Sequence, residues 1–159
     1  MPQSVSGTWD ALYAALQGMF PASANNSTLV SPGDPGDYQP DLIIALMGVK
    51  APITQPTAGT NRSRDKRINI EVVISAYVHG GPEAQQPANQ SAWAAADTIE
   101  AYFRVSPNEK LGGACYNSYV EVTDMDPAIA WEAVDGLPDP VPSGRTAQIA
   151  MTVTAWIRI

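Results

Sequence analysis

The sequence predicts an α+β domain in which a mostly antiparallel sheet carries two helices on one face. Three observations favour this fold class. Two long segments, at 68–78 and 147–159, alternate apolar and polar residues with the period of two of a half-buried strand. Two others, at 9–19 and 89–104, carry apolar residues at helical spacing. Placing both helices on the same face of one sheet is the simplest way to cover the apolar sides of the strands.

The expected order of elements is helix, strand, strand, helix, strand, strand, strand. The first helix covers 9–19, with Thr8 as its N-cap, Asp10 in its first turn and Pro21 beyond its end. A short apolar run at 42–49 has the length and the flanking prolines of a strand. The first half of the chain therefore supplies one helix and one strand before the strongest alternating segment.

Loops are predicted where proline and glycine gather. The segment 31–37 is dense in turn-forming residues, and 51–67 is a long polar loop, of a length that is usually functional or disordered. The second helix is expected at 89–104, capped by Asn89 or Ser91.

The last third of the chain is predicted to form strands. The segments 116–122 and 128–134 are expected as two separate strands, the second with a weaker pattern. A loop rich in proline and glycine at 136–144 then precedes the clear strand at 147–159. No internal repeat or composition break divides the 159 residues, so positions 1–159 are expected to form a single domain.

Composition excludes several function classes. Charged residues make up 16% of the chain, below the roughly 25% of average globular proteins, and this leaves much neutral surface for contacts with partners. The net charge of −7 makes the chain a poor candidate for wrapping nucleic acid. No secretory signal or membrane-spanning apolar run is recognised, so no membrane partner is expected.

Residues that could carry catalysis are few. His79 and Cys115 are the only histidine and the only cysteine, and nothing in the pattern gives either one a catalytic neighbour. Gly112-Gly113 lacks the spacing of a phosphate loop and is expected to be a tight turn. The aspartates at 124, 126, 135 and 139 lack the alternating ligands of a calcium loop. No catalytic residue, cofactor or metal is therefore assigned.

One run is unusual in an acidic protein. Four of the nine basic residues fall within the segment 61–67, Asn-Arg-Ser-Arg-Asp-Lys-Arg. One reading is a solvated loop before a strand; the other is a charged contact with a protein partner or, locally, with DNA. Because the chain as a whole is acidic, we favour a protein contact, in which complementary charge sets register between subunits. The residues assigned to this subunit or tube interface are Arg62, Arg64, Asp65, Lys66 and Arg67.

A resemblance to a known family rests on the order of several motifs. A helix with the pattern Trp-x-x-Leu-x-x-x-Leu at 9–16 is followed by Pro-Asp-Leu-Ile-Ile at 40–44. A charged Arg-Asp segment then leads into Ile-Asn-Ile-Glu-Val-Val-Ile at 68–74. An Ala-rich helix ending in Ile-Glu-Ala-Tyr-Phe at 99–103, Leu-Gly-Gly at 111–113 and a long final strand complete the pattern. In order and spacing the chain resembles the tail terminator proteins of long-tailed, siphovirus-like bacteriophages, particularly those of actinobacteria.

The resemblance implies a structural role in the virion. Tail terminators are small α/β subunits that form a homo-hexameric ring, which caps the finished tail tube, ends its polymerisation and joins the tail to the head–neck connector. The implied partners are further copies of the chain, the tail tube protein and the connector protein, while DNA passes through the lumen without sequence-specific binding. The implied location is the head-proximal end of the tail, after assembly in the host cytoplasm. No catalytic motif or cofactor transfers from this family.

Other functions stay open at this point. Within the same class, the chain could be another head–tail connector, a tail-completion protein or a tail-tube subunit; a tube subunit would stack into long tubes, whereas a terminator stops at single rings. A small-ligand binding module could use Trp93, Trp131 and Trp156, although scattered tryptophans are more often part of a core. An enzyme is the least favoured class, because paired titratable groups are not evident.

Overall fold

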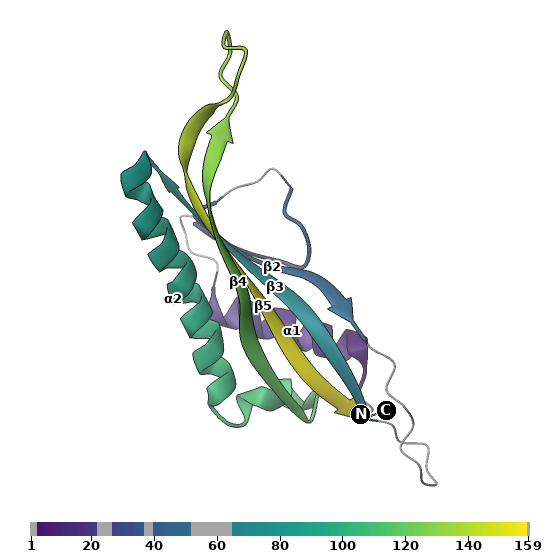
Figure 1. The fold of residues 1–159 in the computed structure, drawn as a ribbon. Coiled ribbons are helices and arrows are strands. Elements are labelled where there is room, and N and C mark those ends of the chain that lie inside the picture. The colour runs from purple at the N-terminus through teal and green to yellow at the C-terminus, as the bar shows by residue number, and fades with distance from the viewer. Residues whose placement is uncertain (1–2, 22–26, 37–39, 52–64, 159) are drawn as a thin grey trace.

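The computed structural model describes residues 3–21, 27–36, 40–51 and 65–158. Within these ranges the chain has an α+β fold with one mixed, five-stranded sheet, which confirms the predicted fold class (Figure 1). The helices are α1 (Val5–Met19) and α2 (Gln85–Arg104), with two 3-10 helices, η1 (Pro82–Ala84) and η2 (Asn108–Gly113). The strands are β1 (Thr28–Ser31), β2 (Leu42–Lys50), β3 (Asp65–His79), β4 (Asn117–Glu132) and β5 (Val141–Arg158).

The strand order across the sheet is β1-β2-β3-β5-β4. Strand β1 pairs with β2 in parallel, and the other three pairings are antiparallel. The expected sequence of elements was wrong in detail: the described residues form three strands, not two, between α1 and α2, and two strands, not three, after α2. The strand that was missed is β1, which has four residues, too few to show a period in the sequence.

Helix α1 begins one turn earlier than expected. The side chain of Ser4, not that of Thr8, caps the helix by accepting a hydrogen bond from the Gly7 N–H at 3.0 Å. Thr8 is buried inside the helix, where its hydroxyl donates to the Ser4 carbonyl oxygen at 2.8 Å and faces the Ala114 carbonyl oxygen at 3.1 Å. Asp10 therefore lies outside the first turn.

Helix α2 also begins before the expected caps. It starts at Gln85, and Pro87 lies in its first turn, where the missing N–H of proline has no partner to lose. Asn89 lies inside the helix and accepts a hydrogen bond from the side chain of Gln85 at 2.9 Å, so neither it nor Ser91 is the N-cap. The end at Arg104 agrees with the sequence prediction.

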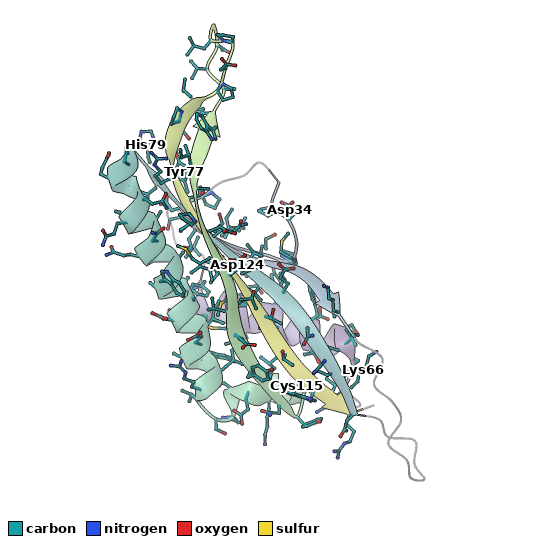
Figure 2. All side chains as sticks on the ribbon, in the orientation of Figure 1. Asp34, Lys66, Tyr77, His79, Cys115 and Asp124 are labelled. Carbon is teal, nitrogen blue, oxygen red and sulfur yellow. The ribbon has the colours of Figure 1, made fainter. Side chains whose placement is uncertain are left out.

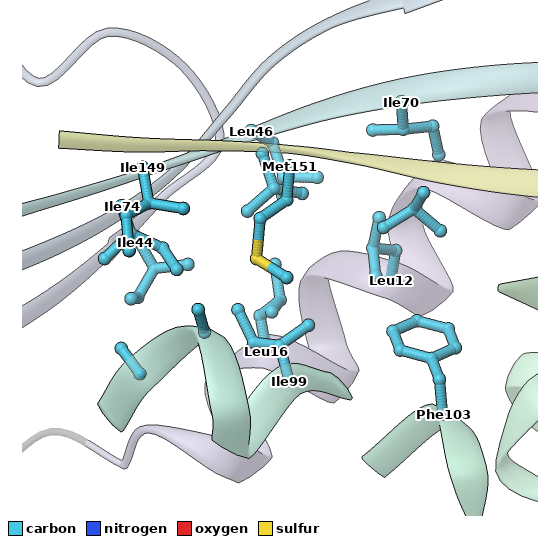
Figure 3. Close-up of a cluster of buried hydrophobic side chains, with 14 of the residues drawn as sticks. Leu12, Leu16, Ile44, Leu46, Ile70, Ile74, Ile99, Phe103, Ile149 and Met151 are labelled. Carbon is cyan, nitrogen blue, oxygen red and sulfur yellow. The ribbon is translucent and has the colours of Figure 1, made fainter. Parts of the chain in front are cut away.

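Both helices pack on the same face of the sheet, as predicted. Alternate residues of β3 and β5, including Ile70 and Met151, are fully buried against this helical layer. Figure 3 shows Leu12 from α1 and Ile99 from α2 meeting these strand residues in one cluster. The apolar stripe of α2 is rich in alanine at Ala88, Ala92, Ala95 and Ala96, and such small side chains let a helix lie close to a sheet.

The two weak strands of the last third are one strand. Strand β4 runs from Asn117 to Glu132 without a break, and a bulge at Thr123 separates its two halves. The bulge changes which residues face the helices, so the alternation in the sequence looks like two short strands. Pro127 lies within β4, which forms the edge of the sheet, where a missing N–H is tolerated.

The predicted loops are shorter than expected where they can be compared. Strand β5 begins at Val141, so 141–144 belongs to a strand rather than to the loop at 136–144. Strand β3 begins at Asp65, so the last three residues of the expected 51–67 loop are also in a strand. The rest of that loop, at 52–64, lies outside the described residues.

Candidate interaction surfaces

The face of the sheet opposite the helices carries the polar half of each alternating strand. We call it the open face, because no helix of the described ranges packs on it (Figure 1). From β3 it presents Asn69, Glu71 and Ser75, and from β5 it presents Gln148 and Thr152, as the pairing register requires. Along β5, the side chains of this face are aromatic and basic near the C-terminal end of the strand and acidic near its middle.

Aromatic and basic side chains gather at the end of the open face where β5 finishes. The rings of Tyr119 and Trp156 lie with centroids 5.5 Å apart, and the guanidinium of Arg158 lies 5.5 Å from the centroid of the Tyr116 ring. Arg67 is exposed and pairs with Trp156 across the ladder between β3 and β5. We call this the aromatic–basic patch; its members are Lys50, Arg67, Tyr116, Tyr119, Trp156 and Arg158.

Arg158 is fixed in this patch by Asp65. Its Nε donates a hydrogen bond to Oδ1 of Asp65 at 3.0 Å, between the first residue of β3 and the last of β5. This hydrogen bond, and then the charge of Asp65, raise the pKa of Arg158 above its ordinary value. Burial, and then the negative charge of Asp65, raise the pKa of the Tyr116 phenol. Both side chains therefore stay in their protonated forms, cation and neutral phenol, across the physiological range.

The five interface residues predicted from the sequence are only partly placed. Arg62 and Arg64 lie outside the described residues. Asp65, Lys66 and Arg67 open β3, with Asp65 and Arg67 on the open face and Lys66 on the helical side. Asp65 lowers the net positive charge of this region, because its carboxylate pairs with the guanidinium of Arg158.

The middle of the open face is acidic. Glu71 on β3 and Glu121 on β4 both pair with Thr152, from either side of β5. Asp124 and Asp126 follow along β4, and all four carboxylates are exposed. We call these four residues the acidic row. Among the described residues, no group of three or more histidine, cysteine, aspartate or glutamate side chains is arranged to hold a metal ion.

Where β4 ends and β5 begins, these two strands continue past the rest of the sheet. The last residue of β3, His79, pairs with Gly144, so residues 131–143 form an extension in which only β4 and β5 pair, through Trp131–Pro142 and Glu132–Val141, and 133–140 form the loop between them. Figure 1 shows this extension reaching beyond the first turn of α2. We call residues 131–143 the hairpin arm. Its tip turns through Gly136, which has a positive φ of 87°, and the Leu137 N–H donates to the Val134 carbonyl oxygen at 3.2 Å.

The hairpin arm exposes apolar and acidic side chains together. Trp131, Leu137 and Val134 have 60%, 54% and 41% of their surface exposed. No basic residue occurs between Trp131 and Ser143, whereas the arm contains three exposed acidic residues, Glu132, Asp135 and Asp139. The sequence pattern predicted a loop at 136–144, and the arm was not singled out. The available signal was Val141, an apolar residue among the prolines that resumes the pattern of β5.

The lone histidine and the lone cysteine are far apart. His79 is exposed at the end of β3 near the hairpin arm, whereas Cys115 is buried at the opposite end of the molecule (Figure 2). Cys115 is 1% exposed, and its Sγ lies 3.4 Å from the Glu109 carbonyl oxygen. Burial raises the pKa of its thiol, which disfavours the reactive thiolate. The two residues cannot act as a catalytic pair in this fold.

The three tryptophans considered for a ligand pocket lie in separate places. Trp93 is exposed on α2, Trp131 is exposed in the hairpin arm, and Trp156 is half-buried in the aromatic–basic patch. The expectation that they belong to the core was wrong, and they do not converge on one cavity. Trp131 in the hairpin arm and Trp156 in the aromatic–basic patch belong to a residue type that is enriched at protein–protein interfaces.

Known families and curated proteins give no match to this sequence. No helix in the described ranges combines the length and the apolar character that a membrane crossing requires.

Proposed function

We propose that the protein is the structural subunit of a ring that caps a bacteriophage tail tube, ends its polymerisation and joins the tail to the head–neck connector. The family resemblance in the sequence supports this role. The observation that carries the proposal is the hairpin arm, which extends past the sheet and exposes Trp131 and Leu137. Apolar groups on a projecting element are typical of a surface that another protein covers, because water is excluded only when a partner is bound.

The arrangement of surfaces supports assembly from identical copies. A closed ring is built from heterologous contacts, in which two different patches of each subunit meet around the circle. The chain has two such surfaces of different character, the hairpin arm and the aromatic–basic patch, at opposite ends of β5. The acidic row and the net charge of −7 are compatible with a ring through which DNA passes without binding.

Native mass spectrometry and electron microscopy of the purified protein test the proposal. We expect closed rings with six times the subunit mass of 16.9 kDa, alone or on the ends of purified tail tubes. A protein that stays monomeric both alone and with tubes would remove the ring function. Labelled protein should be located at the head-proximal end of the tail in virion images.

The same images separate the terminator role from that of a tube subunit. A terminator should stop at single rings and should shorten tubes when it is present during their polymerisation. A tube subunit should stack into tubes whose length grows with subunit concentration.

The basic run gives a second test of the interface. Reversal of charge in the double variant Arg64→Glu, Arg67→Glu should weaken assembly more than it lowers the melting temperature. Unchanged ring formation would remove the contact role of this run. The variant Lys110→Glu is a matched control, because Lys110 is exposed in η2, outside the run.

A further inference from the structure

One continuous strand separates the hairpin arm from the aromatic–basic patch. Strand β5 begins in the arm at Val141 and reaches the patch at Trp156 and Arg158. At about 3.3 Å per residue, the stretch from Val141 to Trp156 is about 50 Å long. Because β5 is hydrogen-bonded to β4 along this stretch, and to β3 from Gly144 onward, it cannot bend back on itself. The arm therefore cannot reach the patch of its own chain.

The two surfaces are complementary in chemistry. The arm carries Glu132, Asp135 and Asp139 around exposed apolar side chains, with no basic residue among them. The patch carries Lys50, Arg67 and Arg158 around the rings of Tyr116, Tyr119 and Trp156. Among the described residues, Arg158 forms an ion pair with Asp65, whereas Lys50 and Arg67 form none. Trp, Tyr and Arg are the residue types that most often dominate binding at protein interfaces.

The acidic row restricts where an acidic arm can bind on the open face. Glu71, Glu121, Asp124 and Asp126 occupy the part of the open face between the arm and the patch. An acidic arm that approaches the open face of another copy is repelled there and attracted at the patch. Like charges at a wrong position and opposite charges at the right one together fix the register of a contact.

We propose that the hairpin arm of one copy docks on the aromatic–basic patch of the next copy. This inference rests on the proposed ring function and names the contact that builds the ring. Trp131 and Leu137 lie against Tyr119 and Trp156, while the carboxylates of the arm face Arg67 and Lys50. Since arm and patch are at opposite ends of each subunit, the contact is head-to-tail and repeats until the ring closes.

Charge reversal in two separate variants tests the contact. The arm-reversed variant carries Glu132→Lys, Asp135→Lys and Asp139→Lys, and the patch-reversed variant carries Lys50→Glu and Arg67→Glu. All five positions are exposed, so both variants should fold with the circular dichroism of the wild type. Each variant alone should need a subunit concentration about tenfold or more higher than wild type to assemble.

A mixture of the two variants is the decisive sample. The arm of each variant then matches the patch of the other, so the mixture should recover assembly in particles that alternate the two chains. Native mass spectrometry identifies such particles by their mixed mass. Failure of the mixture to assemble, when both variants are folded, would overturn the arm-to-patch contact, as would normal assembly of either variant alone.

Disulfide cross-linking tests the same contact without changing charge. A chain carrying both Leu137→Cys and Tyr119→Cys should form ladders of dimers, trimers and longer species under mild oxidation, because each copy links to two neighbours. The single variants should give no more than dimers. Leu137→Cys with Asp97→Cys on α2 is the matched control and should give no ladder. Cys115 does not interfere, since it is buried.

The outcomes separate this inference from the ring function. Wild-type protein that forms rings, together with arm-reversed protein that forms the same rings, removes the docking contact and leaves the ring function standing. Wild-type protein that never assembles removes both. If patch reversal changes only the retention of DNA on a column and leaves assembly intact, the patch is a nucleic-acid contact and the inference is wrong.

Discussion

The ring of Tyr77 covers Gly144 on the neighbouring strand. A Cβ atom placed on Gly144 would lie 2.8 Å from Cε2 of that ring and 2.5 Å from the Val78 carbonyl oxygen. The Tyr77 hydroxyl donates to the Ser143 carbonyl oxygen at 3.3 Å. An aromatic ring over a strand glycine is a recurrent device where sheets bend. Here it lies at the point where the hairpin arm leaves the three-stranded part of the sheet.

The variant Gly144→Ala should therefore be destabilised. The added methyl group overlaps backbone and ring atoms, and overpacking of this kind costs about 1–3 kcal/mol. Thermal unfolding followed by circular dichroism measures the effect. The control is Gly48→Ala in β2, where no atom lies within 4 Å of the added Cβ; its free energy of unfolding should change by less than about 0.5 kcal/mol. Equal stability of the two variants would contradict the close packing of Tyr77 on Gly144.

Removal of the hairpin arm should leave the fold intact. Ala130 and Gly144 pair directly across β4 and β5, so a two-residue Asn-Gly turn can replace residues 131–143. The arm's residues 131–140 are all exposed and contribute little burial, so the melting temperature should fall by less than about 4 °C. Ring formation should be lost. A truncated chain that unfolds would show that the arm stabilises the subunit itself.

Cys115 should be slow to react with thiol reagents. Its side chain is buried, and burial raises the pKa of the thiol, so at pH 8 the native protein contains less thiolate than an unfolded chain does. The control is the double variant Tyr119→Cys, Cys115→Ser, whose single thiol lies at an exposed position of β4. We expect a chromogenic thiol reagent to modify Cys115 about tenfold or more slowly than the thiol of this control. Equal rates would contradict the burial of Cys115.

Because the pKa of Cys115 is raised in the folded protein, its contribution to the free energy of unfolding should fall at alkaline pH. The contribution of the protonated Cys115 thiol is present below the pKa of the unfolded thiol, about 8.5. It is lost as the pH rises toward the folded pKa, because the unfolded chain releases its proton first. The variant Cys115→Ser should therefore show a smaller loss of stability between pH 8 and about pH 10 than the wild type.

Glu83 should stabilise the start of α2 in a pH-dependent way. Hydrogen bonds from the backbone N–H groups of Glu83 and Gly81 lower the pKa of its carboxyl, and Gly81 N lies 3.0 Å from Oε1. For a lowered pKa the contribution is present above the unfolded value and is lost as the pH falls through the folded one. The variant Glu83→Gln should melt below the wild type at pH 7, and the gap should close below about pH 4. Gln90→Ala, at an exposed position of α2, is the control; its side chain carries no titratable proton, so its difference from the wild type should not depend on pH.

The sequence was sufficient to predict the parts of the fold whose residues report their surroundings locally. Strands β3 and β5 have one face on the helices and one open face, so their alternation is nearly unbroken. Strand β1 has only four residues, too few to show an alternating pattern, and it lies parallel to β2, with Thr28 paired to Leu42. The predicted starts of both helices were too late. Ser4 caps α1 four residues before Thr8, and η1 leads directly into α2 at Gln85, before Asn89 and Ser91.

The surfaces could be predicted less well than the fold. The basic run at 61–67 drew attention to one end of β3, and Arg67 does lie in the aromatic–basic patch. Tyr119 and Trp156 are 37 positions apart, and only the register between β4 and β5 brings their rings together. The hairpin arm was hidden for a similar reason: prolines and glycines at 136–144 are typical of a loop, and only pairing with β4 makes 141–143 a strand.

Strand β5 also has a mechanical consequence. It runs from the hairpin arm to the aromatic–basic patch and lies between β3 and β4, with hydrogen bonds perpendicular to its direction on both sides for most of its length. Tension applied between an arm and the opposite end of the same subunit acts along this strand. Such a load shears many backbone hydrogen bonds at once instead of opening them one after another. Subunits joined end to end and pulled in this direction therefore resist extension mainly through β5, the longest strand of each subunit.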